Sequence, residues 1–433
     1  MLGPLAPRGS GGGAYLALDD SGATPRLYVG GLSWRNSSVN RLTDADGKLA
    51  MAGYITGFDV WARKPEGDVG FTGDLACVDG TLLSSGQSSW GFRGAKWTSY
   101  DARTGAFKGL VEMRDPKGKS FKASGHGELV SGKDGNLYSQ VSSGTVFRFH
   151  GNGKAFPFPA RSGFALGGLY QLHSRQTGVF ASRDGRIYVP TGYQKSRGEG
   201  RKPLNVIDRT RVVVFDADGN EISPAAVKVE QTRVAGLAAD RQGNIYLGAR
   251  TAPKDQQLPA WIDGRLPADA TSQTRTTYQQ VATIFKFSPS GGEIRAEEDG
   301  KWITALNRGP TPADVQNALW SVRGGLVPRK WGCYCETTRL DIDGYGRLFI
   351  PDTLRFSVLV VDAAGNQVSR IGGYGNMDNR GPDSAHPRPA IAFAWPLSAR
   401  VHDGMLVVAD QLNCRLLSAA LMYEATATCE VRK

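Results

Sequence analysis

The sequence lacks the signals of several protein classes. No run of about eighteen apolar residues occurs in the 433-residue chain, so it predicts no membrane-spanning helix. Residues 1–13 are rich in Gly and Pro and lack a basic stretch followed by an apolar one, so we expect a flexible segment and no signal peptide in this chain. Nucleophile-elbow, phosphate-loop and His-Glu-x-x-His patterns are also missing, so no motif indicates a particular reaction.

Cysteine is scarce, and the odd number of five prevents complete internal pairing. Cys333 and Cys335 would point to the same face of a strand, where they could form a strained disulfide, bind a soft metal or remain thiols. Cys414 and Cys429 could form a disulfide in the last repeat, which would indicate an oxidising compartment. Buried free cysteine is the alternative for the whole set.

Glycine is abundant instead. The 56 glycines and 22 prolines supply many tight turns, and 40% apolar residues are enough for a core. Short apolar strands end at glycine turns and are followed by a second β-rich strand, as at 136–138 and 186–189. The seven turns are Ser21-Gly22, Asp79-Gly80, Asp134-Gly135, Asp184-Gly185, Gln242-Gly243, Tyr345-Gly346 and Asp403-Gly404. An outer hairpin often follows, as at 215–220 and 361–366, and such paired hairpins are typical of a radial repeat fold.

The repeats run nearly from end to end, so we expect one closed all-β domain over residues 14–433. Its blades should be four-stranded antiparallel sheets of a single β-propeller. Seven units predict seven blades, and six blades are the alternative if the first or last unit is incomplete.

Two inserts interrupt the pattern, at 251–280 and 296–331. The second contains Thr311 as a candidate N-cap and Pro312 at the first helical position. This pattern predicts a short helix over 311–323.

The C-terminal repeats resemble a known family. In chain order they carry a glycine-rich loop, a proline, a strand, an aspartate and an Asn-x-Arg sequence, at 370–375, Pro396, 404–409, Asp410 and 413–415. This order resembles the NHL repeat, closely from about 333 to 421 and loosely elsewhere. The resemblance implies a six- or seven-bladed β-propeller with a central channel, and it implies little about chemistry.

Side chains where the inner strands begin are candidates for a site, because loops on that face converge on the channel. The carboxylates of Asp74, Glu128 and Glu336 would suit calcium, and adding His126 would allow zinc. The corresponding function is a metal-assisted lyase or hydrolase acting on a sugar derivative or lactone. Its catalytic residues would be His126 or Glu336 as the base and Arg233 as the group that stabilises negative charge.

Aromatic and polar residues near the same mouth predict a ligand-binding surface, namely Trp331, Tyr334, Trp395, Asn376 and Arg380. They favour a binding function over the enzymatic one, because no reaction-specific motif accompanies them. The favoured function is a propeller that holds a glycan or protein on its loop-rich face. We expect it to be a monomeric domain and a module of a larger extracytoplasmic or secreted protein.

The chain carries a formal net charge of +11. Basic residues gather in and after the second repeat, at Arg93, Lys96, Arg103, Lys108, Arg114, Lys117, Lys119 and Lys122. Because no nucleic-acid motif accompanies them, we interpret this cluster as a solvated outer edge that keeps strands from aggregating.

Overall fold

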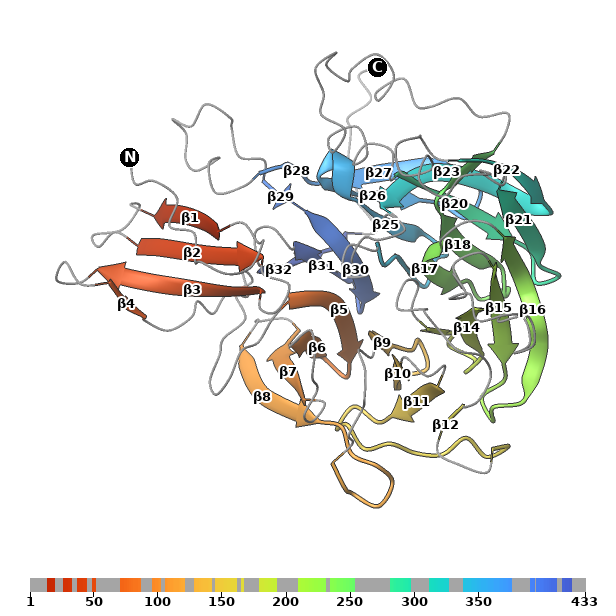
Figure 1. Cartoon of the computed structure of the whole chain (residues 1–433), viewed down its shortest axis with the longest axis horizontal. Helices are drawn as coiled ribbons and strands as arrows, with labels where there is room; N and C mark the ends of the chain where they lie inside the picture. The colour runs from red at the N-terminus through yellow and green to blue at the C-terminus, as the bar shows by residue number, and fades with distance from the viewer. Residues whose placement is uncertain are drawn as a thin grey trace, which may run out of the picture.

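The computed structural model of the chain describes residues 14–19, 26–32, 37–44, 49–51, 71–86, 96–102, 106–120, 128–141, 145–161, 165–166, 179–192, 209–230, 234–253, 281–296, 311–326, 338–375, 390–393, 395–410 and 415–422. This part of the chain is a β-propeller in which six sheets surround a central channel (Figure 1).

Blades 1 to 3 follow one another along the chain. Blade 1 consists of β5 (Phe71–Val78), β6 (Thr81–Gly86), β7 (Lys96–Asp101) and β8 (Phe107–Glu112). Blade 2 consists of β9 (Glu128–Ser131), β10 (Leu137–Val141), β11 (Thr145–Phe149) and β12 (Ala165–Leu166). Blade 3 consists of β13 (Phe180–Ala181), β14 (Ile187–Gly192), β15 (Arg209–Phe215) and β16 (Glu221–Glu230).

Blades 4 to 6 complete the ring. Blade 4 consists of β17 (Val234–Ala239), β18 (Ile245–Ala249), β20 (Val281–Phe287) and β23 (Ala318–Leu326). Blade 5 consists of β24 (Asp341–Ile342), β25 (Leu348–Asp352), β26 (Ser357–Val361) and β27 (Gln367–Ile371), with the short 3-10 helix η4 (Thr353–Arg355). Blade 6 consists of β30 (Pro396–His402), β31 (Met405–Asp410) and β32 (Arg415–Ala420). The predicted antiparallel blades are confirmed, with four strands in each of blades 1 to 5, whereas blade 6 has three strands among the described residues and not the predicted four.

The ring closes directly between blade 6 and blade 1. Strand β30 lies beside β5, and one buried core cluster joins Val407 and Leu416 of blade 6 to Leu82 and Tyr100 of blade 1. The first repeat forms a separate sheet of β1 (Ala14–Asp19), β2 (Arg26–Leu32), β3 (Ser37–Asp44) and β4 (Leu49–Met51). Figure 1 shows this sheet outside the ring. The prediction of seven blades was therefore wrong. The first repeat forms a sheet of its own, but this sheet is not one of the blades of the ring.

The predicted helix over 311–323 is also wrong. These residues form β22 (Thr311–Gln316) and the start of β23, which meet at Asn317 with φ of +60°. Val315, Trp320 and Val322 pack against the core of the neighbouring blades. Branched and aromatic side chains suit a strand, and this packing outweighs the N-terminal helix signals.

Three strands from the two inserts and the hairpin between them enlarge blade 3. Strand β21 (Gly292–Ala296) pairs with β16 in parallel and with β22 in antiparallel orientation. Strand β22 also pairs in parallel with β19 (Thr251–Pro253), so the sheet has seven strands. Gly291 makes this contact possible, because a Cβ there would lie 1.7 Å from the carbonyl oxygen of Ala226. Blades 3 and 4 are thus joined along their outer edges.

Two further strands, β28 (Gly373–Tyr374) and β29 (Ala392–Phe393), form a short parallel pair. Within the described ranges, no helix has the length and apolar character that would let it cross a membrane.

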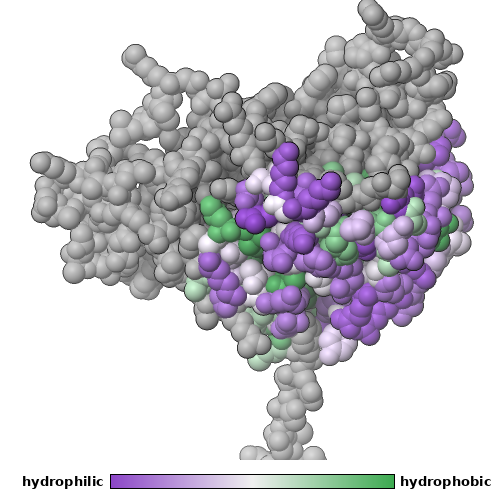
Figure 2. All heavy atoms as spheres, turned by 90° about the horizontal axis from the view of Figure 1, so that it is seen from below, coloured by the Kyte–Doolittle hydropathy of each residue, from purple (hydrophilic) through white to green (hydrophobic). Residues whose placement is uncertain are grey.

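The described residues on the face seen in Figure 2 are mostly hydrophilic, with smaller hydrophobic areas between them. Five residues of the predicted basic cluster are described, and the four whose side chains are described, Lys108, Arg114, Lys117 and Lys119, are all exposed. Lys108 lies 3.4 Å from a carboxylate oxygen of Asp101. This exposure and pairing agree with a solvated edge.

Candidate functional site

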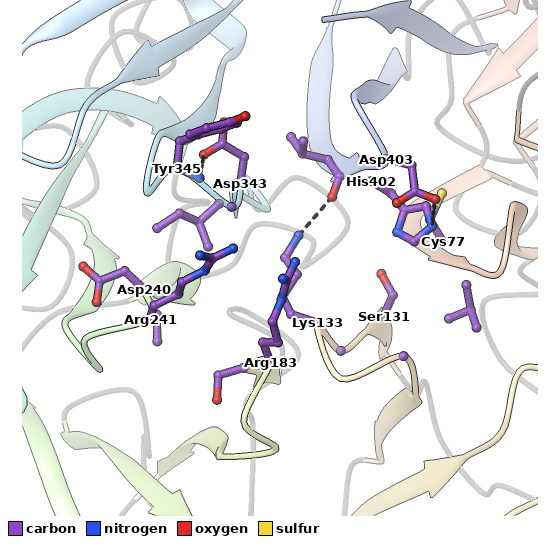
Figure 3. A pocket seen from close by; sticks show the side chains of 18 of the residues that line it. Cys77, Ser131, Lys133, Arg183, Asp240, Arg241, Asp343, Tyr345, His402 and Asp403 are labelled. Carbon is purple, nitrogen blue, oxygen red and sulfur yellow. Dashed lines mark hydrogen bonds and ion pairs between the residues drawn. The ribbon is translucent and has the colours of Figure 1, made fainter. Parts of the chain in front are cut away.

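A cavity of about 660 Å³ lies at one end of the channel, where the first and second strands of the blades turn (Figure 3). We call it the turn cavity. All six blades contribute to its lining, from the segments 77–79, 131–135, 182–184, 239–241, 342–345 and 401–404. The glycines of these turns have φ between +66° and +83°, a region that glycine adopts without a steric penalty.

Three consecutive blades place a cation at the same position of this turn. In each turn, the backbone N–H of the glycine donates a hydrogen bond to a carbonyl oxygen three residues earlier. The residue directly after that carbonyl is Lys133, Arg183 or Arg241. Blade 5 has Gly344 at the equivalent position. A Cβ at Gly344 would lie 3.2 Å from Nη2 of Arg241, so the glycine leaves room for the neighbouring guanidinium group.

Lys133 is held by the opposite wall of the channel. Its Nζ lies 2.7 Å from Oδ2 of Asp341 in blade 5, and it donates a 3.0 Å hydrogen bond to the carbonyl oxygen of Val401 in blade 6. The backbone N–H of Val401 also donates to Oδ2 of Asp341, at 2.8 Å. The positive charge of Lys133 is therefore used to join blades 2, 5 and 6.

Several carboxylates of the cavity are also used within their own turns. Asp184 lies 3.2 Å from Nε of Arg186, and Asp343 lies 2.7 Å from Nη2 of Arg347. Asp240 accepts hydrogen bonds from two backbone N–H groups of its turn. These acids stabilise the hairpins, and the side chains of Asp240 and Asp343 are buried in doing so, whereas that of Asp184 keeps 55% of its surface exposed.

Arg183 and Arg241 are exposed, and neither makes a hydrogen bond or ion pair with another residue in the part of the chain that the structure describes. Figure 3 shows both guanidinium groups directed toward the centre of the cavity. Asp403 lies across the cavity from them, within 3.0 Å of His402. Asp79 is exposed at the turn of the neighbouring blade 1. The turns of blades 3 and 4 thus present two guanidinium groups beside the paired carboxylates of Asp184 and Asp240, and the turns of blades 6 and 1 present Asp403 and Asp79. We call these the basic wall and the acidic wall.

An aromatic ring stands at the edge of the cavity. Tyr345 is 73% exposed, and the guanidinium carbon of Arg347 lies 5.1 Å from the centre of its ring. Most tyrosines of the propeller core are buried, as Tyr138 and Tyr246 are. An exposed ring beside polar groups offers a flat surface for stacking.

Cys77 lies in the cavity wall with only 3% of its surface exposed. Burial raises the pKa of its thiol to about 12, and the nearby Lys133 opposes this shift only in part. A pKa this far above neutrality leaves almost no thiolate at physiological pH, so Cys77 is a packing residue.

We therefore expect Cys77 to resist alkylation in the folded protein. Incubation with iodoacetamide at about pH 8 should leave the peptide that contains Cys77 unmodified, because the thiolate is the reactive form. After unfolding in guanidinium chloride the same peptide should be fully labelled. Mass spectrometry of the two digests measures this, and rapid labelling of the folded protein would contradict the burial described above.

The residues predicted from the sequence concern the other end of the channel, where inner strands begin. Seven of them lie outside the described residues, namely His126, Arg233, Trp331, Tyr334, Glu336, Asn376 and Arg380. Asp74 lies in β5 and Glu128 begins β9, but their side chains are not described. The backbone N–H of Trp395 donates a 2.8 Å hydrogen bond to Oδ1 of Asp410.

The metal site and the lyase or hydrolase function therefore remain predictions. Among the described residues, no group of three or more His, Cys, Asp or Glu side chains is placed to hold a metal ion. The disulfide alternatives also concern undescribed residues, apart from Cys77, which is free.

Sequence reasoning missed the turn cavity, because the glycine turns were interpreted only as connections. A signal was available: Lys133, Arg183 and Arg241 occupy one position in three aligned repeats. Cations repeated at the tips of turns that face a common axis indicate a shared basic surface.

No protein-family model and no curated protein matches the sequence. Solved structures with a similar arrangement include a gluconolactonase from Xanthomonas campestris, with 13% identity, coverage of 96% of this chain and 99% of that chain, and a TM-score of 0.39. A PQQ-bound aldose sugar dehydrogenase from Streptomyces coelicolor has 13% identity and a TM-score of 0.41, and the match covers 85% of this chain and 95% of that chain. A virginiamycin B lyase from Staphylococcus aureus has 9% identity and a TM-score of 0.35, and the match covers 82% of this chain and 86% of that chain. Because these scores are low, the β-propeller assignment rests on the strand order and ring closure of this chain.

Proposed function

We propose that the chain is a ligand-binding β-propeller of the NHL type that holds a glycan in the turn cavity. The observation that carries this proposal is the convergence of turns from all six blades on one cavity of about 660 Å³. An extracytoplasmic position, as a module of a larger protein, belongs to the same proposal.

The size and lining of the cavity support a saccharide. Small-molecule sites commonly have volumes of roughly 300–1,000 Å³, which accommodates one or two sugar rings. Arg183, Arg241, Asp79 and Asp403 provide both donors and acceptors for hydroxyl groups. The exposed ring of Tyr345 provides a face on which a sugar ring can stack.

The proposal can be tested by filling the cavity. Replacing Gly344 with Trp places a large side chain beside Arg241, and we expect binding to an array of neutral and acidic oligosaccharides to fall by about tenfold or more. Ala364→Trp is the matched control, because Ala364 is exposed on an outer turn of the same blade. Thermal unfolding would establish that both variants are folded.

Two outcomes would overturn the proposal. If the Gly344→Trp variant binds the same oligosaccharides as strongly as the unaltered protein, the ligand lies elsewhere. If the unaltered protein binds none of the oligosaccharides, a glycan is not its ligand.

A further inference from the structure

We infer that the ligand is an acidic saccharide whose single anionic group binds to Arg183 and Arg241. This inference rests on the proposed function and adds the chemical class of the ligand. It assigns the anion to the wall formed by blades 3 and 4, and the hydroxyl groups to the wall formed by blades 6 and 1.

The first argument is the use of charge in the turn cavity. The fold uses Lys133 against Asp341, and it uses the carboxylates of Asp184 and Asp343 within their own turns. Three charged residues of the cavity lining make no hydrogen bond or ion pair with other described residues. They are Arg183, Arg241 and Asp79. This remainder favours a ligand with negative charge.

The second argument is the chemistry of the two cations. A guanidinium group presents several N–H donors in a planar fork that matches the two oxygens of a carboxylate. Arg183 and Arg241 extend from equivalent turn positions of adjacent blades, and Figure 3 shows both pointing into the same space. Gly344 keeps the space beside Arg241 open. One anionic group can therefore contact both side chains.

The third argument is the opposite wall. Asp403 at the turn of blade 6 lies across the cavity from the two arginines. Asp79 at the turn of the neighbouring blade 1 also lines the cavity, and its Oδ2 lies close to the outer turn of blade 2, 3.8 Å from where a Cβ of Gly151 would stand. Carboxylates accept hydrogen bonds from hydroxyl groups, and they repel a second anion. A ligand with one acid group and several hydroxyls satisfies both walls, whereas a polyanion does not.

A phosphate or sulfate ester could offer the same anionic oxygens as a uronic acid, so the experiment includes both kinds of group. Isothermal titration calorimetry would compare a disaccharide with one uronic acid, its methyl ester, the corresponding neutral disaccharide and the 6-phosphate of the neutral disaccharide. Inorganic phosphate alone would be a separate titrant. We expect the uronic acid or the phosphate ester to bind about tenfold more tightly than the methyl ester, with an affinity that falls as salt is added.

Variants separate the two walls. Changing Arg183 and Arg241 together to Gln should reduce the affinity for the acidic disaccharide to that for its methyl ester. The matched control changes Lys117 and Lys228 together to Gln, which removes the same charge from exposed positions away from the turn cavity. This control should bind as the unaltered protein does.

The acidic wall is tested by changing Asp79 and Asp403 together to Asn. Both residues have positive φ, 48° and 47°, which asparagine tolerates, so the turns are preserved. This variant should weaken the neutral disaccharide at least as much as the acidic one, because it removes acceptors for the hydroxyl groups and removes no attraction for the anion.

The outcomes distinguish the two proposals. If the neutral and acidic disaccharides bind equally and Gly344→Trp abolishes both, the inference is wrong and the proposed function stands. Binding of inorganic phosphate as tightly as the acidic disaccharide would overturn the inference, because the site would then recognise any small anion. If no disaccharide binds to the unaltered protein, both proposals are wrong.

Discussion

Replacing Asp240 with Ala is expected to lower the free energy of unfolding by about 3–5 kcal/mol, the usual effect of removing one partner from a buried ionic network. Oδ1 of Asp240 accepts backbone N–H bonds from Gln242 at 3.0 Å and Asn244 at 2.9 Å. Oδ2 accepts the side-chain amide of Asn244 at 2.7 Å and the hydroxyl of Tyr246 at 2.9 Å, and Nζ of Lys286 lies 3.7 Å away. Asp240→Ala would leave all these donors without this partner in a buried region.

The chain contains a matched control in the outer turn of blade 3. Asp216 accepts the same kind of bonds, from the backbone N–H groups of Asp218 and Asn220 and from the side-chain amide of Asn220. The bond from Asn220 lowers the pKa of Asp216, but this turn is largely solvated. Asp216→Ala should therefore cost only about 1 kcal/mol. Urea denaturation followed by tryptophan fluorescence compares the two variants, and equal losses would show that burial does not determine the effect.

Replacing Lys133 with Met is expected to lower the free energy of unfolding by about 2–3 kcal/mol, toward the lower end of the effect for buried pairs. The side chain of Lys133 keeps 24% of its surface exposed, whereas that of Asp341 keeps only 5%. The methionine retains most of the packing volume but leaves the buried carboxylate of Asp341 without its cation. The carboxylate would keep only the 2.8 Å bond from the backbone N–H of Val401 among its described contacts.

A double-mutant cycle tests the cause of this loss. Changing Asp341 to Asn together with Lys133→Met removes both charges, so the double variant should lose less stability than the sum of the two single variants. Lys228→Met is the control for removal of an exposed cation. Additive losses in urea denaturation would mean that the ion pair across the channel does not stabilise the ring.

Much of the propeller could be predicted from short segments of sequence. The turns at Gly135, Gly185, Gly243 and Gly346 formed as expected, because a tight hairpin needs positive φ at that position and glycine supplies it. The strands that follow them were also predictable, since branched and aromatic residues suit a half-buried pleated surface.

The prediction over 311–323 failed for a physical reason. Thr311 and Pro312 are good helix-start residues, but their contribution is local and small. The side chains of Trp320 and Val322 gain more by packing on the core that blades 3, 4 and 5 share. The indole N–H of Trp320 also donates a 3.0 Å bond to the carbonyl oxygen of Ala363 in blade 5. Such a contact joins residues distant in the chain, so a local pattern could not reveal it.

The sequence by itself determined the hairpins, because turn chemistry and strand patterning act over a few neighbouring residues. Only the tertiary structure decided that six of the hairpin units close the ring, because closure depends on how the sides of blades 6 and 1 fit together. It also decided which cation is paired across the channel: Lys133, Arg183 and Arg241 occupy equivalent positions, but among the described contacts only Lys133 forms an ion pair with Asp341. Coulomb attraction depends on distance in space, and distance in space is set by the assembled fold.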